Sequence, residues 1–193
     1  DHSHQSERLT MDAFAPRPPK MSHTLRALAW LLRYPDAELR RLAPALAAAL
    51  REEGAIESSR LAELEALASR LAAGDGIRTE SDYVELFDRG RRTALHLFEH
   101  VHGDSRDRGQ AMVDLAQTYE RAGLRLNAGE LPDYLPAVLE FASTQPPREA
   151  RAFLRETSHI VRSIFSALAE RGSPYASVVA AVLDLAGERA ERV

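Results

Sequence analysis

Apolar residues recur every three or four positions along most of this chain, and short breaks rich in glycine and proline separate these stretches. The clearest stretch runs from Phe153 to Leu168, where the apolar positions fall on one side of a helix. Alanine, leucine, arginine and glutamate dominate the composition, and all four favour helices. Runs of β-branched residues, which strands prefer, are scarce. The sequence therefore predicts an all-α fold, with seven or eight helices in a single compact domain.

Capping residues and prolines mark the first expected helix boundaries. One helix should stop at Tyr34-Pro35, because proline disfavours helical geometry in the residue before it. Asp36 is then a suitable N-cap for the next helix, since its carboxylate can accept from a free N–H of the first turn.

The middle of the chain carries two further helix predictions. Apolar spacing predicts one helix from Thr79 to near His102, interrupted at Gly90, where glycine costs about 1 kcal/mol relative to alanine. Leu131, which is followed by proline and aspartate, is expected to begin another helix. The segment Gln145-Pro146-Pro147 would end that helix and precede the next one.

The first 20 residues differ from the rest of the chain. They are polar and contain proline, and they lack the apolar segment of a secretory signal. We expect residues 1–20 to be a disordered leader or an artificial extension, and residues 21–193 to form the helical domain. No apolar run approaches the roughly 20 residues that a membrane helix needs, so direct membrane insertion is not expected.

Charge and cysteine content exclude several classes of function. The chain has 25 Lys+Arg and 29 Asp+Glu, a net charge of -4 at pH 7. This balance disfavours binding to nucleic acid, which needs a basic face, and suits a basic peptide. The chain has no cysteine, which excludes disulfides, thiolate metal sites and ligation of an iron–sulfur cluster by this chain.

Three histidines in the stretch HLFEHVHGDSRDRG raise the question of a metal site. In a continuous helix His96 and His100 share one face, and His102 or Glu99 would supply a third ligand for zinc. The order differs from the H-E-x-x-H motif, and no carboxylate takes the place of a metalloprotease base. The more ordinary interpretation is partly exposed histidines near a helix C-terminus. A metal-dependent enzyme built on these three histidines is kept as an alternative hypothesis, as is a helical scaffold for some other partner.

Two charged segments have both a structural and a functional interpretation. Arg106, Asp107 and Arg108 either form local salt bridges at a helix start or hold two helices at a fixed angle beside a groove. Glu130 and Asp133 either satisfy free N–H groups at a helix start or form an acidic rim for a basic ligand.

Longer motifs carry a resemblance to a known family. Similarity is concentrated in the run YVELFDRGRRTALHLFEHVHGDSRDRGQAMVDL and in the later ELPDYLPAVLEF, with LAWLLRYPD as an earlier match. Together these resemble the NarJ-type nitrate reductase assembly chaperones, also called the nitrate reductase delta subunit. The similarity spans Thr24 to Ala142 and continues to Leu185. The family belongs to a wider group of helical redox-enzyme maturation proteins, which implies a TorD/NarJ-like helical fold.

The resemblance implies a chaperone and not an enzyme, with no cofactor of its own. Family members bind the catalytic molybdenum subunit of respiratory nitrate reductase in the cytoplasm, notably through that subunit's N-terminal segment. They hold it competent for cofactor insertion and delay its docking at the membrane. Molybdenum cofactor biosynthesis proteins are a second implied class of partner. This chain departs from the family in its extra leader and in a short C-terminus, Gly187 to Val193.

The family motifs also imply a peptide-binding site, residue by residue. Four side chains would form or support an apolar groove wall: Tyr83, Phe87, Leu95 and Phe98. A polar hinge would consist of His100, His102, Arg106, Asp107 and Arg108. The rim of the groove would consist of Glu130, Asp133 and Tyr134.

Overall fold

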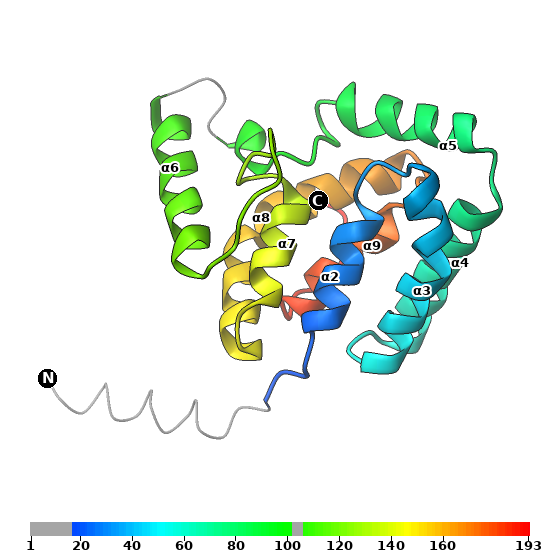
Figure 1. Ribbon diagram of the computed structural model, residues 1–193, viewed down its shortest axis with the longest axis horizontal. Helices are drawn as coiled ribbons and strands as arrows, with labels where there is room; N and C mark the ends of the chain where they lie inside the picture. The colour runs from blue at the N-terminus through cyan, green and yellow to red at the C-terminus, as the bar shows by residue number, and fades with distance from the viewer. Residues whose placement is uncertain (1–16, 102–105) are drawn as a thin grey trace, which may run out of the picture.

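The computed structural model describes residues 17–101 and 106–193, and it consists of helices joined by short connections (Figure 1). Eight α-helices lie in these residues: α2 (Ser22–Leu31), α3 (Ala37–Glu53), α4 (Ser58–Ala73), α5 (Gly76–Tyr83), α6 (Arg106–Arg121), α7 (Leu135–Ser143), α8 (Pro147–Glu170) and α9 (Ala176–Leu185). Between α5 and α6 lie a π-helix, η1 (Val84–Asp88), and a 3-10 helix, η2 (Leu97–His100). No strand forms within the described ranges, so the prediction of an all-α fold is confirmed.

Local signals set the first helix boundaries as expected. α2 ends before Tyr34-Pro35, and the Asp36 carboxylate caps α3 by accepting from the N–H of Leu39 at 2.9 Å. At the other end of α3, the Glu53 carboxylate accepts from the N–H of Thr24 at 2.8 Å. The end of α3 therefore caps the start of α2, whose own first residues provide no side-chain cap.

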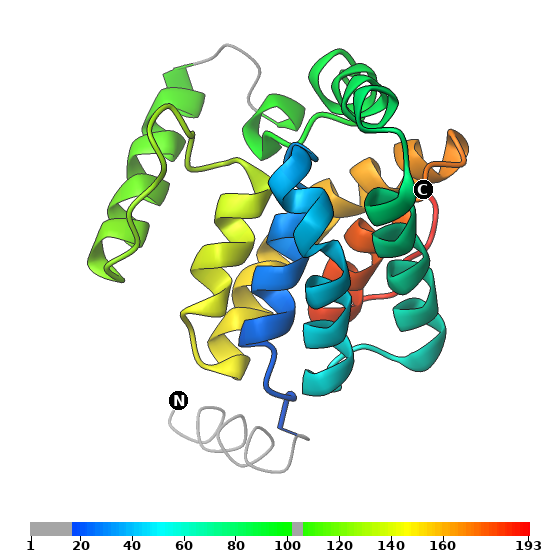
Figure 2. The same ribbon diagram turned by 45° about the vertical axis from the view of Figure 1, so that its right-hand side comes forward.

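α2 lies at the centre of the helix packing. It contacts α3, α7 and α9, and both views show it between α7 and α3 (Figures 1 and 2). The long α8 pairs with α9, and α4 pairs with α3. These helices share one apolar core, in which Leu28, Leu64, Leu139 and Val178 are fully buried. None of the helices in the described part of the chain is long and apolar enough to cross a membrane.

A smaller apolar cluster anchors α6 at the outer edge, beyond α7 (Figures 1 and 2). Tyr119 is the buried residue of this helix. Its ring centroid lies 5.0 Å from that of Phe141 in α7, and its hydroxyl donates to the carbonyl of Pro132 at 2.7 Å. One tyrosine thus joins α6 both to α7 and to the turn before it.

The single helix expected from Thr79 to His102 is wrong. α5 begins earlier and runs into η1, where the N–H of Arg89 donates to the carbonyl of Val84 at 3.1 Å, and regular helix then stops. The stop has a local cause, because the Thr93 hydroxyl donates to the carbonyl of Leu86. A Cβ at Gly90 would collide with both of these groups, so glycine permits the close turn that ends the helix.

The expected start of a helix at Leu131 is also wrong, because α7 begins at Leu135. The residues before it form a turn that pairs with the segment preceding η2. The N–H of Leu97 donates to the carbonyl of Asp133 at 3.0 Å, and the N–H of Leu135 donates to that of Leu95 at 2.9 Å. These tertiary bonds hold the turn outside helical geometry. The break at residues 145–147 is confirmed, since α8 begins at the third of them.

Candidate functional site

The candidate site lies where three segments that are far apart in the sequence meet. They are residues 32–34 at the end of α2, residues 83–100, and the turn 127–134. An isolated antiparallel β-bridge pairs His96 with Tyr134, and the two backbone hydrogen bonds described above flank it. This pairing brings the expected groove and rim segments together.

Two tyrosines of the expected site lie against the end of α2. The Tyr83 hydroxyl donates to the carbonyl of Leu32 at 2.5 Å, and the hydroxyl oxygens of Tyr83 and Tyr134 are 3.3 Å apart. Burial raises the pKa of both phenols, so both are neutral near pH 7. Tyr83 is only 3% exposed, which makes it a support of the site and leaves Tyr134 nearer the surface.

Arg33, which follows α2, fixes the position of Tyr134. Its guanidinium forms ion pairs with Glu130 at 2.8 Å and Glu140 at 2.9 Å, and it lies 5.8 Å from the centroid of the Tyr134 ring. Partial burial opposes the charge of Arg33, but the two carboxylates outweigh it and raise the pKa of the guanidinium. Glu130, expected at the rim, therefore takes part in an ion-pair network that is largely shielded from water.

Asp133 holds η2 in place from inside the protein. It has no exposed surface, and its carboxylate accepts from the N–H of Phe98 at 3.0 Å. Leu95 is buried, and the partly buried ring of Phe98 packs against the main core. Leu95 and Phe98 were expected to form or support a groove wall, and Asp133 to lie at its rim; in the structure Asp133 is buried and holds η2.

Phe87 belongs to a buried aromatic cluster. Its ring centroid lies 4.7 Å from that of Tyr83 and 5.1 Å from that of Tyr175, the residue before α9. Phe87 itself is 4% exposed, so it too supports the site without reaching its surface.

His96 and His100 do not share a helix face, because no regular helix joins them. The His96 ring stacks on Tyr134, with 5.0 Å between centroids, whereas Nε2 of His100 donates to the carbonyl of Ala94 at 2.7 Å. His102 lies outside the described residues. In the two described ranges, no group of three or more histidine, aspartate or glutamate side chains is arranged to hold a metal ion. The helical spacing that motivated the zinc hypothesis is therefore absent from the fold.

Three residues of the expected polar hinge, Arg106, Asp107 and Arg108, begin α6. Arg108 forms an ion pair with Glu99 of η2 at 3.7 Å, which joins the segments on either side of residues 102–105. Both side chains are partly exposed, so the pair contributes on the order of 0–1 kcal/mol. Arg106 and Asp107 are exposed in the first turn of α6, where the negative charge of Asp107 interacts favourably with the helix dipole.

An open pocket of about 340 Å³ lies at this junction. The residues that line it include Arg33, Asp88, His96, Glu130 and Tyr134, and the turn 127–131 forms one edge. The Asp88 carboxylate is exposed and forms no ion pair with any described residue. An unpaired carboxylate beside two stacked aromatic rings suits a cationic ligand group, which gains from both charge and the ring faces.

Two charged residues that line this pocket, Arg33 and Asp88, were not predicted from the sequence. Arg33 stands in the motif LLRYPD, but an arginine just after a helix is most often solvated, and its partner Glu140 is 107 positions away. Asp88 was expected within a helix, and in the structure it is the last residue of η1 and lines the pocket. Neither position carries a local signal that points to the site.

This chain is similar to known proteins over most of its length. The family described as nitrate reductase delta subunit matches residues 34–181. The nitrate reductase molybdenum cofactor assembly chaperone NarJ of Escherichia coli (strain K12) is 42% identical over 156 residues, which are 81% of this chain and 66% of that protein. A protein of Bacillus subtilis (strain 168) assigned the same role is 34% identical over 162 residues, which are 83% of this chain and 86% of that protein.

A solved structure supports the fold. The crystal structure of an Archaeoglobus fulgidus protein assigned as a redox enzyme maturation protein superposes with a TM-score of 0.59 and 21% identity. The match covers 87% of this chain and 94% of the other. This chain spans 66% of the length of the E. coli relative, just under two thirds.

Proposed function

Because the chain belongs to the nitrate reductase delta subunit family, we propose that it acts as an assembly chaperone for the catalytic molybdenum subunit of a nitrate reductase. In this role it has no catalytic activity of its own. It binds the apo subunit through that subunit's N-terminal segment, in the cytoplasm and before the complex docks at the membrane. The subunit thereby stays competent for insertion of the molybdenum cofactor, which cofactor biosynthesis proteins deliver.

The observation that supports this role most is the similarity over most of the chain to proteins named as such chaperones in two bacteria. The composition agrees with it, because a chain without cysteine cannot ligate an iron–sulfur cluster through thiolates. A factor of this kind prepares another protein to receive its cofactors.

We place one peptide contact at the pocket beside Tyr134. A lysine or arginine of the N-terminal segment would lie across the stacked rings of His96 and Tyr134, with its charge toward Asp88. The net charge of -4 favours the encounter with a basic segment. Arg33, held by Glu130 and Glu140, acts as a positioning residue for the Tyr134 ring.

Calorimetry with a synthetic peptide of the reductase N-terminal segment tests both the chaperone role and the contact at the pocket beside Tyr134. We expect a Kd in the micromolar range or below, which corresponds to about -8 kcal/mol or stronger. Asp88→Asn should weaken binding roughly tenfold, because it removes one charge-assisted contact. Glu156→Gln changes a carboxylate that is exposed on α8, away from this pocket, and should leave the Kd unchanged.

Each outcome bears on a different part of the proposal. A folded protein that produces no binding heat with the peptide would overturn the chaperone role stated here. Binding that is equal in the wild type and in Asp88→Asn would keep that role and remove the pocket beside Tyr134 as the contact.

A further inference from the structure

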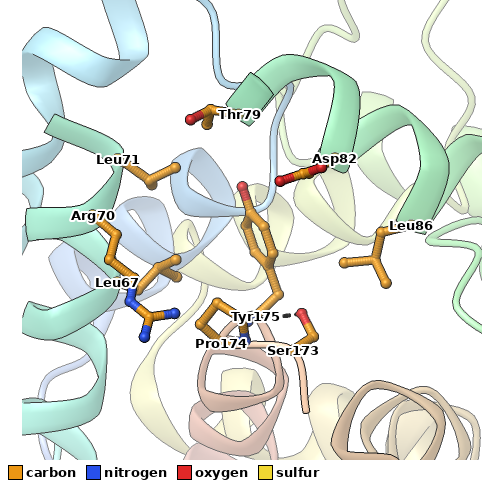
Figure 3. A pocket seen from close by; sticks show the side chains of 9 residues that line it. All are labelled: Leu67, Arg70, Leu71, Thr79, Asp82, Leu86, Ser173, Pro174 and Tyr175. Carbon is orange, nitrogen blue, oxygen red and sulfur yellow. Dashed lines mark hydrogen bonds between the residues drawn. The ribbon is translucent and has the colours of Figure 1, made fainter. Parts of the chain in front are cut away.

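A second pocket, of about 260 Å³, opens between α4, α5 and residues 173–175, which precede α9 (Figure 3). It is separate from the pocket beside Tyr134, and the two share none of their lining residues. Its walls are mainly apolar, with Leu67, Leu71, Leu86 and Pro174 around the ring of Tyr175. Its volume is below the roughly 300–1,000 Å³ of pockets that hold whole small-molecule ligands, so it suits one side chain.

The Tyr175 hydroxyl is a buried polar group with an unused hydrogen-bonding capacity. Tyr175 is 8% exposed, and its hydroxyl has no hydrogen-bond partner among the described residues. The hydroxyl points into the pocket, toward the end formed by Thr79 and Asp82 of α5 (Figure 3). Buried hydroxyls nearly always have a partner, so this one marks the place where a ligand atom would be accommodated.

Charges are arranged at opposite ends of the pocket. The exposed Asp82 carboxylate lies beside the Tyr175 hydroxyl and forms no ion pair with any described residue (Figure 3). Burial and then the charge of Asp82 raise the pKa of the Tyr175 phenol, which agrees with their closeness. The Arg70 guanidinium lies at the other end, near Pro174 (Figure 3). The pocket therefore favours a ligand with a positive end and an acceptor some atoms away.

We propose that this pocket binds the side chain of one lysine or arginine residue of a protein partner. The cationic end donates to the Asp82 carboxylate and to the Tyr175 hydroxyl oxygen. The aliphatic stem covers the leucine walls, and the backbone carbonyl of the same residue accepts from Arg70. A basic residue within a peptide has this order of groups, whereas a free amine lacks the carbonyl. The inference does not depend on which partner supplies the residue.

Nuclear magnetic resonance of the full chain tests the proposal with a single-residue probe, N-acetyl-lysine methylamide. The matched probe N-acetyl-norleucine methylamide keeps the apolar stem and the carbonyl but lacks the ammonium group. We expect saturable shifts around Asp82 and Tyr175 with a Kd on the order of 1 mM for the lysine probe. The norleucine probe should bind at least about tenfold more weakly, as should the lysine probe with Asp82→Asn.

Two controls separate binding from folding. Tyr175→Phe should weaken the lysine probe while the protein stays folded, and Glu156→Gln should bind it as the wild type does. Equal affinity for the two probes, an unchanged Kd in Asp82→Asn, or no saturable shift at tens of millimolar would overturn the proposal. Shifts confined to the surroundings of His96 and Tyr134 would do the same. Because the reductase peptide was assigned to that other pocket, its calorimetry can succeed when this test fails.

Discussion

The same chemical change at two buried tyrosines should alter stability in opposite directions. Tyr83→Phe removes a hydroxyl that donates to the carbonyl of Leu32 at 2.5 Å. That carbonyl follows the end of α2, where carbonyl groups lack partners within the helix. Tyr175→Phe removes a buried hydroxyl that has no partner among the described residues. Both changes preserve the ring and its packing in the shared aromatic cluster.

The expected magnitudes follow from the cost of unpaired polar groups. Tyr83→Phe leaves a buried carbonyl without its donor and should lower the free energy of unfolding by about 1–3 kcal/mol. Tyr175→Phe relieves the desolvation of an unpaired hydroxyl and should raise the same free energy by about 1 kcal/mol. The two variants should therefore differ by roughly 2–4 kcal/mol, although each loses one oxygen atom.

Urea unfolding followed by circular dichroism measures this difference. The slope of the unfolding free energy against urea should be equal in both variants, so that the midpoints report stability directly. For a protein of this size, 1 kcal/mol also corresponds to a change in Tm of roughly 2–4 °C. A Tyr175→Phe variant as destabilised as Tyr83→Phe would refute the reasoning, because it would mean that the Tyr175 hydroxyl is satisfied in the folded protein.

Two further predictions concern one buried carboxylate of the site and three buried tyrosines of the fold. Asp133→Ala removes the acceptor of the Phe98 N–H and should lower the free energy of unfolding by about 1–3 kcal/mol. The control Asp114→Ala, on the surface of α6, should change this free energy by less than about 0.5 kcal/mol. Equal effects of the two variants in urea unfolding would contradict the role assigned to Asp133. Burial raises the pKa of Tyr83, Tyr119 and Tyr175 above the usual value of 10.0, so the folded state keeps these phenols protonated where the unfolded chain ionises them. This contribution to stability is complete below pH 10 and is lost as the pH rises further. Tm should therefore fall as tyrosinate absorbance appears. A Tm that stays unchanged above pH 10 would contradict the raised pKa of these phenols.

Sequence signals were sufficient where local interactions decide the structure. The cap at Asp36 and the break at residues 145–147 depend on neighbours within one turn, and both were predicted correctly. The prediction of one continuous helix after Tyr83 was wrong, because the apolar residues there keep three- and four-residue spacing without forming a regular helix. Its geometry depends on the close turn at Gly90 and on bonds to the turn before α7, which no spacing pattern records.

Family motifs named some residues that line or support the candidate site, but they did not show which of these are buried. Family motifs pointed to Tyr83, Asp133 and Tyr134, and the fold brings these residues together. The motifs could not show which of these residues are buried and which reach the surface, because a buried and an exposed aspartate look alike in a sequence. Arg33 was not predicted to belong to the site, because its role depends on two carboxylates that only the folded chain brings next to it.

The wide turn of η1 makes this part of the chain sensitive to its length. Leu86 lines the pocket of Tyr175, and Asp88, two residues later, lines the pocket of Tyr134. Losing one residue would convert the turn to an ordinary helical one and rotate everything after it by about 100°. A substitution at either residue alters one pocket, whereas a single insertion or deletion between them would change how the two pockets are oriented toward each other.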